Sequence, residues 1–152
     1  MKVIKPEPKH VHDWIQLVQE FLQEGIDQYA WGFSSEDCEA TYFTWLKECI
    51  GFLLEEEGAI VGVLAGNIAI HPFCYTTVYF HESMWFVRKS HRGKGGGIKL
   101  YEACEQECRD RGIKKMVFAH TSLLEVKTFK KIYNKLGFHE LETHYVKDIN
   151  DA

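Results

Sequence analysis

The segment Val87–Ile98, with the sequence VRKSHRGKGGGI, holds the residue types that point most directly to chemistry. It lies between a predicted strand and a predicted helix, and it has glycines at positions 93, 95, 96 and 97. Glycines there let the backbone turn tightly and aim successive N–H groups into one concavity, with the positive end of the following helix dipole behind them. The segment therefore predicts an anion site, and a pyrophosphate is its natural ligand.

Two familiar phosphate-binding motifs do not fit this loop. A Walker A loop requires GxxxxGK[ST], and Lys94 does not have that spacing. A dinucleotide-binding GxGxxG fails because Ile98 stands where the last glycine is needed, and because the loop comes too late for an opening βαβ unit. A third pattern, R/Q-x-x-G-x-G/A after a strand, fits at Arg92, Gly95 and Gly97.

The elements that must position this loop follow from hydrophobic periodicity and from turn residues. Helical spacing of apolar residues predicts three helices besides the one after the loop, and β-branched and aromatic runs predict the strands. The predicted helices are His10–Gln23 with Gly25 as its stop, Ser34–Gly51, Gly95–Arg111 ending at Gly112, and Val126–Leu136. The predicted strands are Val3–Ile4, Phe52–Leu54, Ile60–Ile70, Thr76–Val87, Met116–Ala119 and Phe138–Val146. This order predicts an α/β fold with a mixed sheet and helices on both faces.

Length and composition predict one soluble, cytoplasmic domain over residues 1–152. The chain is 45% hydrophobic and 26% charged, which excludes disordered, collagen-like and low-complexity classes. Its longest apolar runs are too short to cross a bilayer, and the first residues have no signal-peptide core. We therefore expect no membrane partner.

The net charge of −4 is divided unequally along the chain. Residues 1–60 carry a net charge of −8 and residues 61–152 a net charge of +4. Because the total is not basic, we expect no nucleic-acid partner. The basic residues of the second half include a run without acids, which is either a solvated face or a surface for an anion: Arg88, Lys89, Arg92, Lys94 and Lys99.

Five cysteines occur without CxxC spacing. Cys104 and Cys108 share one helix face at i, i+4, but no further His or Cys lies close in sequence to complete a metal site. We therefore expect reduced thiols, mostly buried, and no metal.

The loop, the element order and a late motif together resemble the GNAT superfamily of acyl-CoA-dependent N-acetyltransferases. The loop pattern after a strand is similar to the coenzyme A motif of that family, and Ile98-Lys99-Leu100-Tyr101 opens the next helix as in the family. The segment Phe129–Phe138 is similar to the family's FYxxxGF element, although Ile132 replaces the aromatic residue before Tyr133. The resemblance covers most of the chain. It implies a GNAT acyl-CoA N-acyltransferase fold, with a mostly antiparallel central sheet splayed where the acyl-CoA enters.

The resemblance also implies where the cofactor, acetyl-CoA, is held. Main-chain groups at Trp85, Phe86 and Val87 would pair with the pantetheine arm as an added strand does. The basic side chains near the loop would face the polyanionic cofactor. Backbone N–H groups of the loop would hold the pyrophosphate, so the predicted residues there are Arg92, Gly93, Lys94, Gly95, Gly96, Gly97 and Ile98.

Acetyl transfer to an amine needs a base, an oxyanion donor and a proton for the leaving thiolate. The resemblance makes Tyr133 the candidate acid, because the family's tyrosine at this place points at the cofactor sulfur; its alternative is a core tyrosine. A backbone N–H near Val87 would be the oxyanion donor. For the base, Glu82 has apolar neighbours that would raise the pKa of its carboxyl. His81 is a rival, since imidazole titrates near neutrality, and it faces the other side unless a bulge intervenes.

The acceptor pocket is expected between the first two helices and after the strand at 116–119. The aromatic connector residues Tyr29, Trp31 and Phe33 are candidates to line it, or else they seal the core. His120 is a further candidate, where the family often has Asn nearby.

The predicted function is acetyl transfer from acetyl-CoA to a primary amine by direct attack in a ternary complex. The acceptor, a small molecule or a peptide, is not specified by the sequence. The alternatives are a non-catalytic acyl-CoA-binding module and a phosphate-binding interaction module on the same fold. The oligomeric state is not encoded in any motif, and a homodimer is one admissible assembly.

Overall fold

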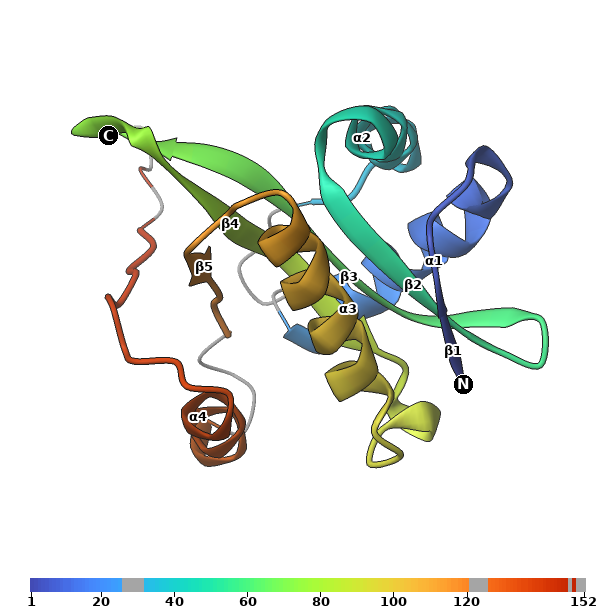
Figure 1. Cartoon of the computed structure of the whole chain (residues 1–152). Helices are drawn as coiled ribbons and strands as arrows, with labels where there is room; N and C mark the ends of the chain where they lie inside the picture. The colour runs from blue at the N-terminus through green and yellow to red at the C-terminus, as the bar shows by residue number, and fades with distance from the viewer. Residues whose placement is uncertain (26–31, 121–125, 148, 150–152) are drawn as a thin grey trace. The chain divides into compact units, whose positions relative to one another are not determined.

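The chain folds as two units, Met1–Ala119 and His120–Ala152, in the computed structural model. The structure describes residues 1–25, 32–120, 126–147 and 149. The first unit holds a five-stranded sheet and three α-helices (Figure 1). The second unit holds helix α4, Val126–Lys135.

The sheet has the strand order β1-β2-β3-β4-β5. Each of the first four strands is antiparallel to its neighbour, and only β5 runs parallel to β4. The sheet is therefore mixed and mostly antiparallel, as predicted. Its strands are β1 Lys2–Ile4, β2 Ile50–Glu56, β3 Ala59–His71, β4 Cys74–Val87 and β5 Met116–Val117.

The helices begin and end where the sequence provides caps. In α2, Ser35–Glu48, the Ser34 hydroxyl accepts the Asp37 N–H at 3.2 Å. Helix α1, Val11–Gly25, ends at the predicted glycine stop. Gly112, at φ +71°, follows α3, Gly96–Asp110. Short 3₁₀ turns at Pro8–His10 and Lys89–His91 precede α1 and the glycine loop.

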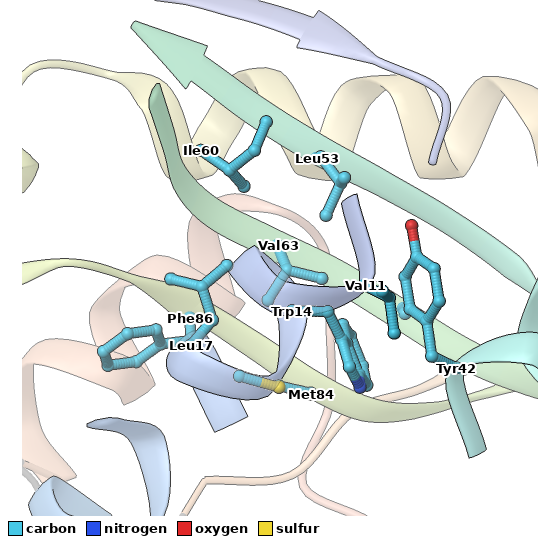
Figure 2. Close-up of a cluster of buried hydrophobic side chains, with 10 residues drawn as sticks. Val11, Trp14, Leu17, Tyr42, Leu53, Ile60, Val63, Met84 and Phe86 are labelled. Carbon is cyan, nitrogen blue, oxygen red and sulfur yellow. The ribbon is translucent and has the colours of Figure 1, made fainter. Parts of the chain in front are cut away.

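The two faces of the sheet bury separate apolar clusters. Helices α1 and α2 cover one face, and Figure 2 shows their side chains against those of β2, β3 and β4. Trp14 is central there, with ring centroids of Tyr42 and Trp45 at 5.6 and 4.7 Å. Helix α3 covers the other face, where Leu100, Cys104 and Cys108 pack on β2, β3 and β4. Helices on both faces are thus confirmed.

A β-bulge in β4 changes which side chains face which helix. Ala65 pairs with Met84 but Gly66 pairs with Glu82, so Ser83 is the extra residue. Before the bulge Phe80 packs in the α3-side cluster, whereas Met84, four residues on, packs in the α1-side cluster. Without the bulge, strand alternation would put both on one face.

One predicted strand is wrong, and one is shorter than expected. Residues 138–147 have no regular secondary structure, although 138–146 were predicted as a strand. A strand needs a neighbour for its backbone N–H and C=O groups, and the only regular element described in this unit is helix α4. The parallel strand covers Met116–Val117 rather than 116–119.

The cysteine thiols are free and the helices are short. All five cysteines are unbridged; Cys104 and Cys108 are buried, whereas Cys74 is exposed. Among the described residues, no helix is long and apolar enough to cross a bilayer.

The bulge depends on the absence of a side chain at Gly66. A Cβ there would clash with the His81 carbonyl oxygen and lie 2.6 Å from the Phe80 ring and 2.8 Å from Glu82 Cα. We predict that Gly66→Ala lowers the free energy of unfolding by about 1–3 kcal/mol, because β4 must move. Urea denaturation measures this effect.

Gly51→Ala is the matched control, since it also adds a methyl group to a strand of the sheet. Its Cβ would meet Ala65 Cβ at 3.4 Å, an ordinary contact. Equal stability changes in the two variants would contradict the role given to Gly66.

Candidate active site

Strands β4 and β5 separate soon after they pair. Phe80 pairs with Met116 and His81 with Val117, and no later residue of β4 pairs with β5. Strand β4 continues to Val87 and bonds to β3 along its other edge. Among the described residues, the β5-side edge of β4 therefore has no strand partner between Ser83 and Val87. We call this region the fork.

The backbone at the end of β4 presents polar groups to the open edge. The Arg88 N–H donates to the Val61 carbonyl at 2.9 Å, on the β3 side. Because N–H and C=O groups alternate between the two edges of a strand, those of Trp85 and Val87 face the open side. The Arg92 side chain confirms this direction, since its Nε donates to the Val87 carbonyl at 2.6 Å.

The glycines of the loop have different structural reasons. Gly93 and Gly95 have φ of +75° and +80°, which L side chains rarely adopt. Gly96 is buried, and a Cβ there would lie 2.5 Å from a Leu54 methyl carbon. Gly97 lies beside Trp85, with its Cβ position 3.6 Å from the indole Nε1.

Helix α3 begins at this loop with its amide groups available to a ligand. The Lys99 N–H donates to the Gly95 carbonyl at 3.1 Å, which is the first bond of the helical ladder. The N–H groups of Gly96, Gly97 and Ile98 thus have no acceptor within the helix. Together with the helix dipole they form a site suited to phosphate oxygens.

The basic side chains around the loop fall into two groups. Arg88 is paired with Glu20 at 2.9 Å and also donates to the Ile60 carbonyl. Arg92 is paired with Glu24 at 2.6 Å. Lys89 and Lys94 are exposed, and the described part of the chain places no carboxylate within ion-pair distance of either. These two lysines are therefore the cations best able to approach an anion.

Glu82 lies where β4 and β5 diverge. Its Oε2 accepts the N–H of Ala119, just beyond β5, at 3.3 Å. Removal of the carboxyl from water raises the pKa of Glu82 to about 7, although the Ala119 N–H acts in the opposite direction. At neutral pH this carboxyl is thus divided between its acid and base forms, as a general base requires.

His81 faces the opposite side of the sheet from Glu82. It is exposed, and its ring centroid lies 6.3 Å from that of Tyr79. The bulge falls at Ser83, after both residues, so it does not bring them to one face. The structure therefore separates the two candidate bases.

The side chains of Trp85 and Phe86 belong to the apolar packing. Phe86 is buried in the α1-side cluster, with its ring centroid 6.0 Å from that of Phe21. Trp85 packs on the α3 side, where its ring centroid lies 5.6 Å from that of Phe118 and 6.1 Å from that of Tyr101. Neither side chain is therefore available to the predicted cofactor. The prediction for the Phe86 backbone is also wrong, because its N–H and C=O point toward β3, where Phe86 pairs with Val63.

The second unit brings Tyr133 and His120 together. Their ring centroids lie 5.8 Å apart, and His120 stacks on Phe129 at 5.7 Å with an interplanar angle of 2°. Phe138 packs edge-on against Tyr133 at 5.5 Å. Within this unit, an acid candidate and an acceptor candidate thus share one aromatic cluster.

The acceptor candidates of the connector are only partly described. Phe33 is exposed just before α2. Tyr29 and Trp31 lie outside the described residues. Over the ranges that the structure describes, no group of three His, Cys, Asp or Glu side chains is arranged to hold a metal ion.

Comparison with known families gives the identity of this fold. The model of the GNAT acetyltransferase family matches residues 13–138, which is most of the chain. The chain belongs to the GNAT acetyltransferase family. A search of curated proteins finds no significant sequence match.

Solved structures of GNAT proteins resemble the whole chain. The aminoglycoside acetyltransferase AAC(6')-Iy, bound to a CoA bisubstrate analogue, has a TM-score of 0.75 at 18% identity, covering 99% of this chain and 98% of that one. A ribosomal-protein-alanine N-acetyltransferase from Brucella melitensis has a TM-score of 0.76 at 15% identity, covering 97% and 98%. A predicted acetyltransferase with acetyl-CoA from Clostridium acetobutylicum has a TM-score of 0.76 at 16% identity, covering 97% of this chain and 95% of that one. At these identities the likeness shows the fold alone.

Sequence reasoning missed two residues that shape this GNAT site. Gly66 and Ser83 form the bulge beside Glu82. A glycine within a strand pattern signals a bulge or a close backbone approach, and Gly66 lies within the predicted strand Ile60–Ile70. That signal was present, but it does not reveal which residue of the partner strand is extra.

The raised pKa of Glu82 makes stability depend on pH. In the folded state the carboxyl keeps its proton up to about pH 7, whereas an ordinary glutamate releases it near 4.5. The folded state thus binds more protons between these values, and its stability falls as pH rises through them. We predict that wild type loses up to about 3 kcal/mol of unfolding free energy relative to Glu82→Gln over this range. Urea denaturation of both proteins at a series of pH values measures the difference.

His81→Gln is the control, because an imidazole ordinarily titrates in the same range. The His81→Gln variant should lose as much unfolding free energy with rising pH, relative to Glu82→Gln, as the wild type does. Parallel stability curves for wild type and Glu82→Gln would rule out a buried, titrating carboxyl.

Proposed function

We propose that this GNAT protein is an N-acetyltransferase that transfers an acetyl group from acetyl-CoA to a primary amine by direct attack in a ternary complex. The observation that carries the proposal is Glu82, whose carboxyl has a pKa of about 7 and lies at the fork. A group that titrates near neutrality at the place where β4 diverges from β5 is suited to deprotonating an ammonium acceptor.

The residues of the fork and the loop fit a bound acyl-CoA. Acetyl-CoA supplies an activated thioester and a leaving thiolate. The loop N–H groups from Gly93 to Ile98 would hold its pyrophosphate, and Lys94 would add charge at the rim. The β4 backbone at Trp85, beyond the last pair of β4 with β5, would bind the pantetheine amides as an added strand does, whereas the Val87 carbonyl already accepts the Arg92 Nε–H. The solved GNAT structures with CoA or acetyl-CoA bound support this assignment.

Glu82 would act on the acceptor. Its carboxylate takes the proton of the ammonium group, directly or through a water, and frees the nitrogen lone pair. That nitrogen then forms the new C–N bond while the C–S bond breaks, and it releases its second proton to solvent as the amide forms. The proton remains on Glu82 until it is released to solvent, so the carboxylate is regenerated for the next cycle.

Val87 and Tyr133 would act on the other two charges that develop. The Val87 N–H, which faces the open edge, would donate to the carbonyl oxygen as it gains negative charge. Tyr133 would give its phenolic proton to the departing thiolate and regain one from solvent. The products are an N-acetylated amine and CoA with a free thiol.

The acceptor would be a cationic amine. The net charge of −8 over residues 1–60 favours the approach of cations. Phe33 and His120, with Tyr29 and Trp31, are the proposed lining residues. Aminoglycosides and peptide amino termini are both cationic, and similar solved structures include an aminoglycoside acetyltransferase and a ribosomal-protein-alanine acetyltransferase. We further propose that residues 1–152 act as one GNAT domain, since the family match runs over parts of both units.

An acceptor screen tests this function. Purified protein is given acetyl-CoA and a panel of aminoglycosides, polyamines and peptides, and release of the CoA thiol is measured against pH. We predict that kcat/KM for the best acceptor rises to a plateau with an apparent pKa of about 7, because Glu82 must be ionised. Glu82→Gln should lower the plateau by roughly 10²-fold or more. A full rate in this variant would remove Glu82 from the mechanism.

Thermal shift separates catalysis from binding alone. Acetyl-CoA at about 100 times its Kd should stabilise wild type by about 2.7 kcal/mol. Gly95→Val forces a β-branched residue to φ +80° and should abolish this shift. A shift without transfer to any acceptor would favour the non-catalytic acyl-CoA-binding module. The absence of a shift would contradict both that module and the acetyltransferase.

Tyr133→Phe tests the proposed acid. The change keeps the ring packing against His120, Phe129 and Phe138 and removes only the hydroxyl. We predict a loss of roughly 10²-fold in kcat with little change in stability, because proton transfer is lost but one hydrogen bond contributes only about 1 kcal/mol. Single-turnover kinetics with a good acceptor measures the chemical step.

Tyr42→Phe is the matched control. The Tyr42 hydroxyl donates to the Glu7 carbonyl at 2.7 Å inside the α1-side packing. Its loss should lower stability and leave turnover per folded molecule unchanged. If Tyr133→Phe behaves in the same way, Tyr133 is a packing residue and not the acid.

A further inference from the structure

Strands β3 and β4 continue beyond the rest of the sheet as a two-stranded arm (Figure 1). The pairing of β2 with β3 stops at Gly66, and β5 contacts β4 only at Phe80 and His81. Within the described residues, positions 67–71 of β3 thus pair only with β4, and positions 74–79 of β4 pair only with β3. We call residues 67–79 the hairpin arm.

The hairpin arm is apolar and uncharged where a protein surface is normally polar. Phe73 is 92% exposed, Tyr75 81%, and Ile70 58%. No Lys, Arg, Asp or Glu occurs from Asn67 to Phe80, in a chain that is 26% charged. Free strand edges are usually protected by charges, and the outer edge of β3 at 67–71 has none.

The apolar face of the arm continues one of the two cores. Ile68 lies opposite Phe80 and Ile70 opposite Val78, and paired residues project to the same face. Phe80 and Val78 pack in the α3-side cluster. The two isoleucines therefore extend this apolar face beyond the last helix that covers it.

We propose that the hairpin arm joins two copies of this chain into a homodimer, with the free edges of β3 at residues 67–71 pairing antiparallel across a two-fold axis. An antiparallel pair of identical segments is self-complementary, which an interface between two copies requires. The uncharged edges approach without local repulsion, although each chain has a net charge of −4.

The edge pairing would bury a small interface. Its contact consists of the paired β3 backbone and the flanking isoleucines, of which Ile68 is 36% and Ile70 58% exposed, with Phe73 in the turn at the tip of the arm. Tyr75 lies on β4, the strand away from the paired edge. A small interface is typical of a reversible dimer, so the dimer population should depend on protein concentration.

Mass measurement by light scattering and sedimentation, over a concentration series, tests the dimer. We expect twice the chain mass of 17.7 kDa for the wild type. Ile70→Lys should return the protein to a single chain, because it places a charge on each copy among the apolar side chains that flank the paired edges. Phe73→Lys provides a second arm variant, should the first fold poorly by circular dichroism. A wild type that is monomeric at all concentrations would falsify the proposal.

Tyr145→Lys is the matched control, since Tyr145 is 93% exposed and lies outside the arm. It should remain a dimer. A dimer that survives both arm variants, or that is lost only in Tyr145→Lys, would show that another surface joins the copies.

Hydrogen exchange identifies what covers the edge of β3. Protection of the amides at 67–71 should increase with protein concentration in the wild type and should not do so in Ile70→Lys. Protection that is equal in the wild type and in monomeric Ile70→Lys would mean that the same chain covers this edge, and the proposal would be wrong.

Discussion

The bulge at Ser83, opposite Gly66, is the feature on which the rest of the site depends. Strand β4 has to serve both apolar clusters, and the extra residue lets Phe80 face α3 while Met84 and Phe86 face α1. It lies two residues beyond His81, the last residue of β4 that pairs with β5. The same irregularity therefore allows β4 to pack in both cores at the place where it diverges from β5. A shift of β4 would disturb the packing of both clusters and the position of Glu82 together.

The electrostatics of the site follow from this geometry. Glu82 lies in protein surroundings and accepts one backbone N–H. Burial therefore raises the pKa of its carboxyl to about 7, from the ordinary glutamate value of 4.5. The loop has the opposite character, because Arg88 and Arg92 are neutralised by Glu20 and Glu24 of α1. These ion pairs fix the end of β4 to α1, and they leave lysines and helix N–H groups to meet an anion. In the proposed mechanism, anion binding and proton transfer would therefore fall to separate groups along one strand and its loop.

Most of the fold could be predicted from the sequence because its signals are local. The Ser34 cap, the glycine stops at Gly25 and Gly112, and the alternation in β3 and β4 place these elements within a few residues. The predicted strand at 138–146 was wrong because strand formation depends on a partner, which no local pattern encodes. The candidate site was found through the loop and Glu82, and the pKa direction of Glu82 followed from its apolar neighbours. Strand alternation predicted that His81 and Glu82 face opposite sides unless a bulge intervenes, and only the structure shows that the bulge falls after both residues, at Ser83.

The length of β4 connects the two proposals made for this protein. One end of the strand carries Val87 and leads into the glycine loop, while the other end lies in the uncharged hairpin arm. Between them, within the described ranges, only Phe80 and His81 pair on both edges, with β3 and with β5. A two-stranded ribbon without other neighbours is marginally stable in water. Pairing of the arm with a second copy would therefore hold β4 on the side of the bulge that the rest of the sheet does not reach. It would do so without covering the open edge at Trp85 and Val87, since that edge lies beyond the bulge and faces away from β3.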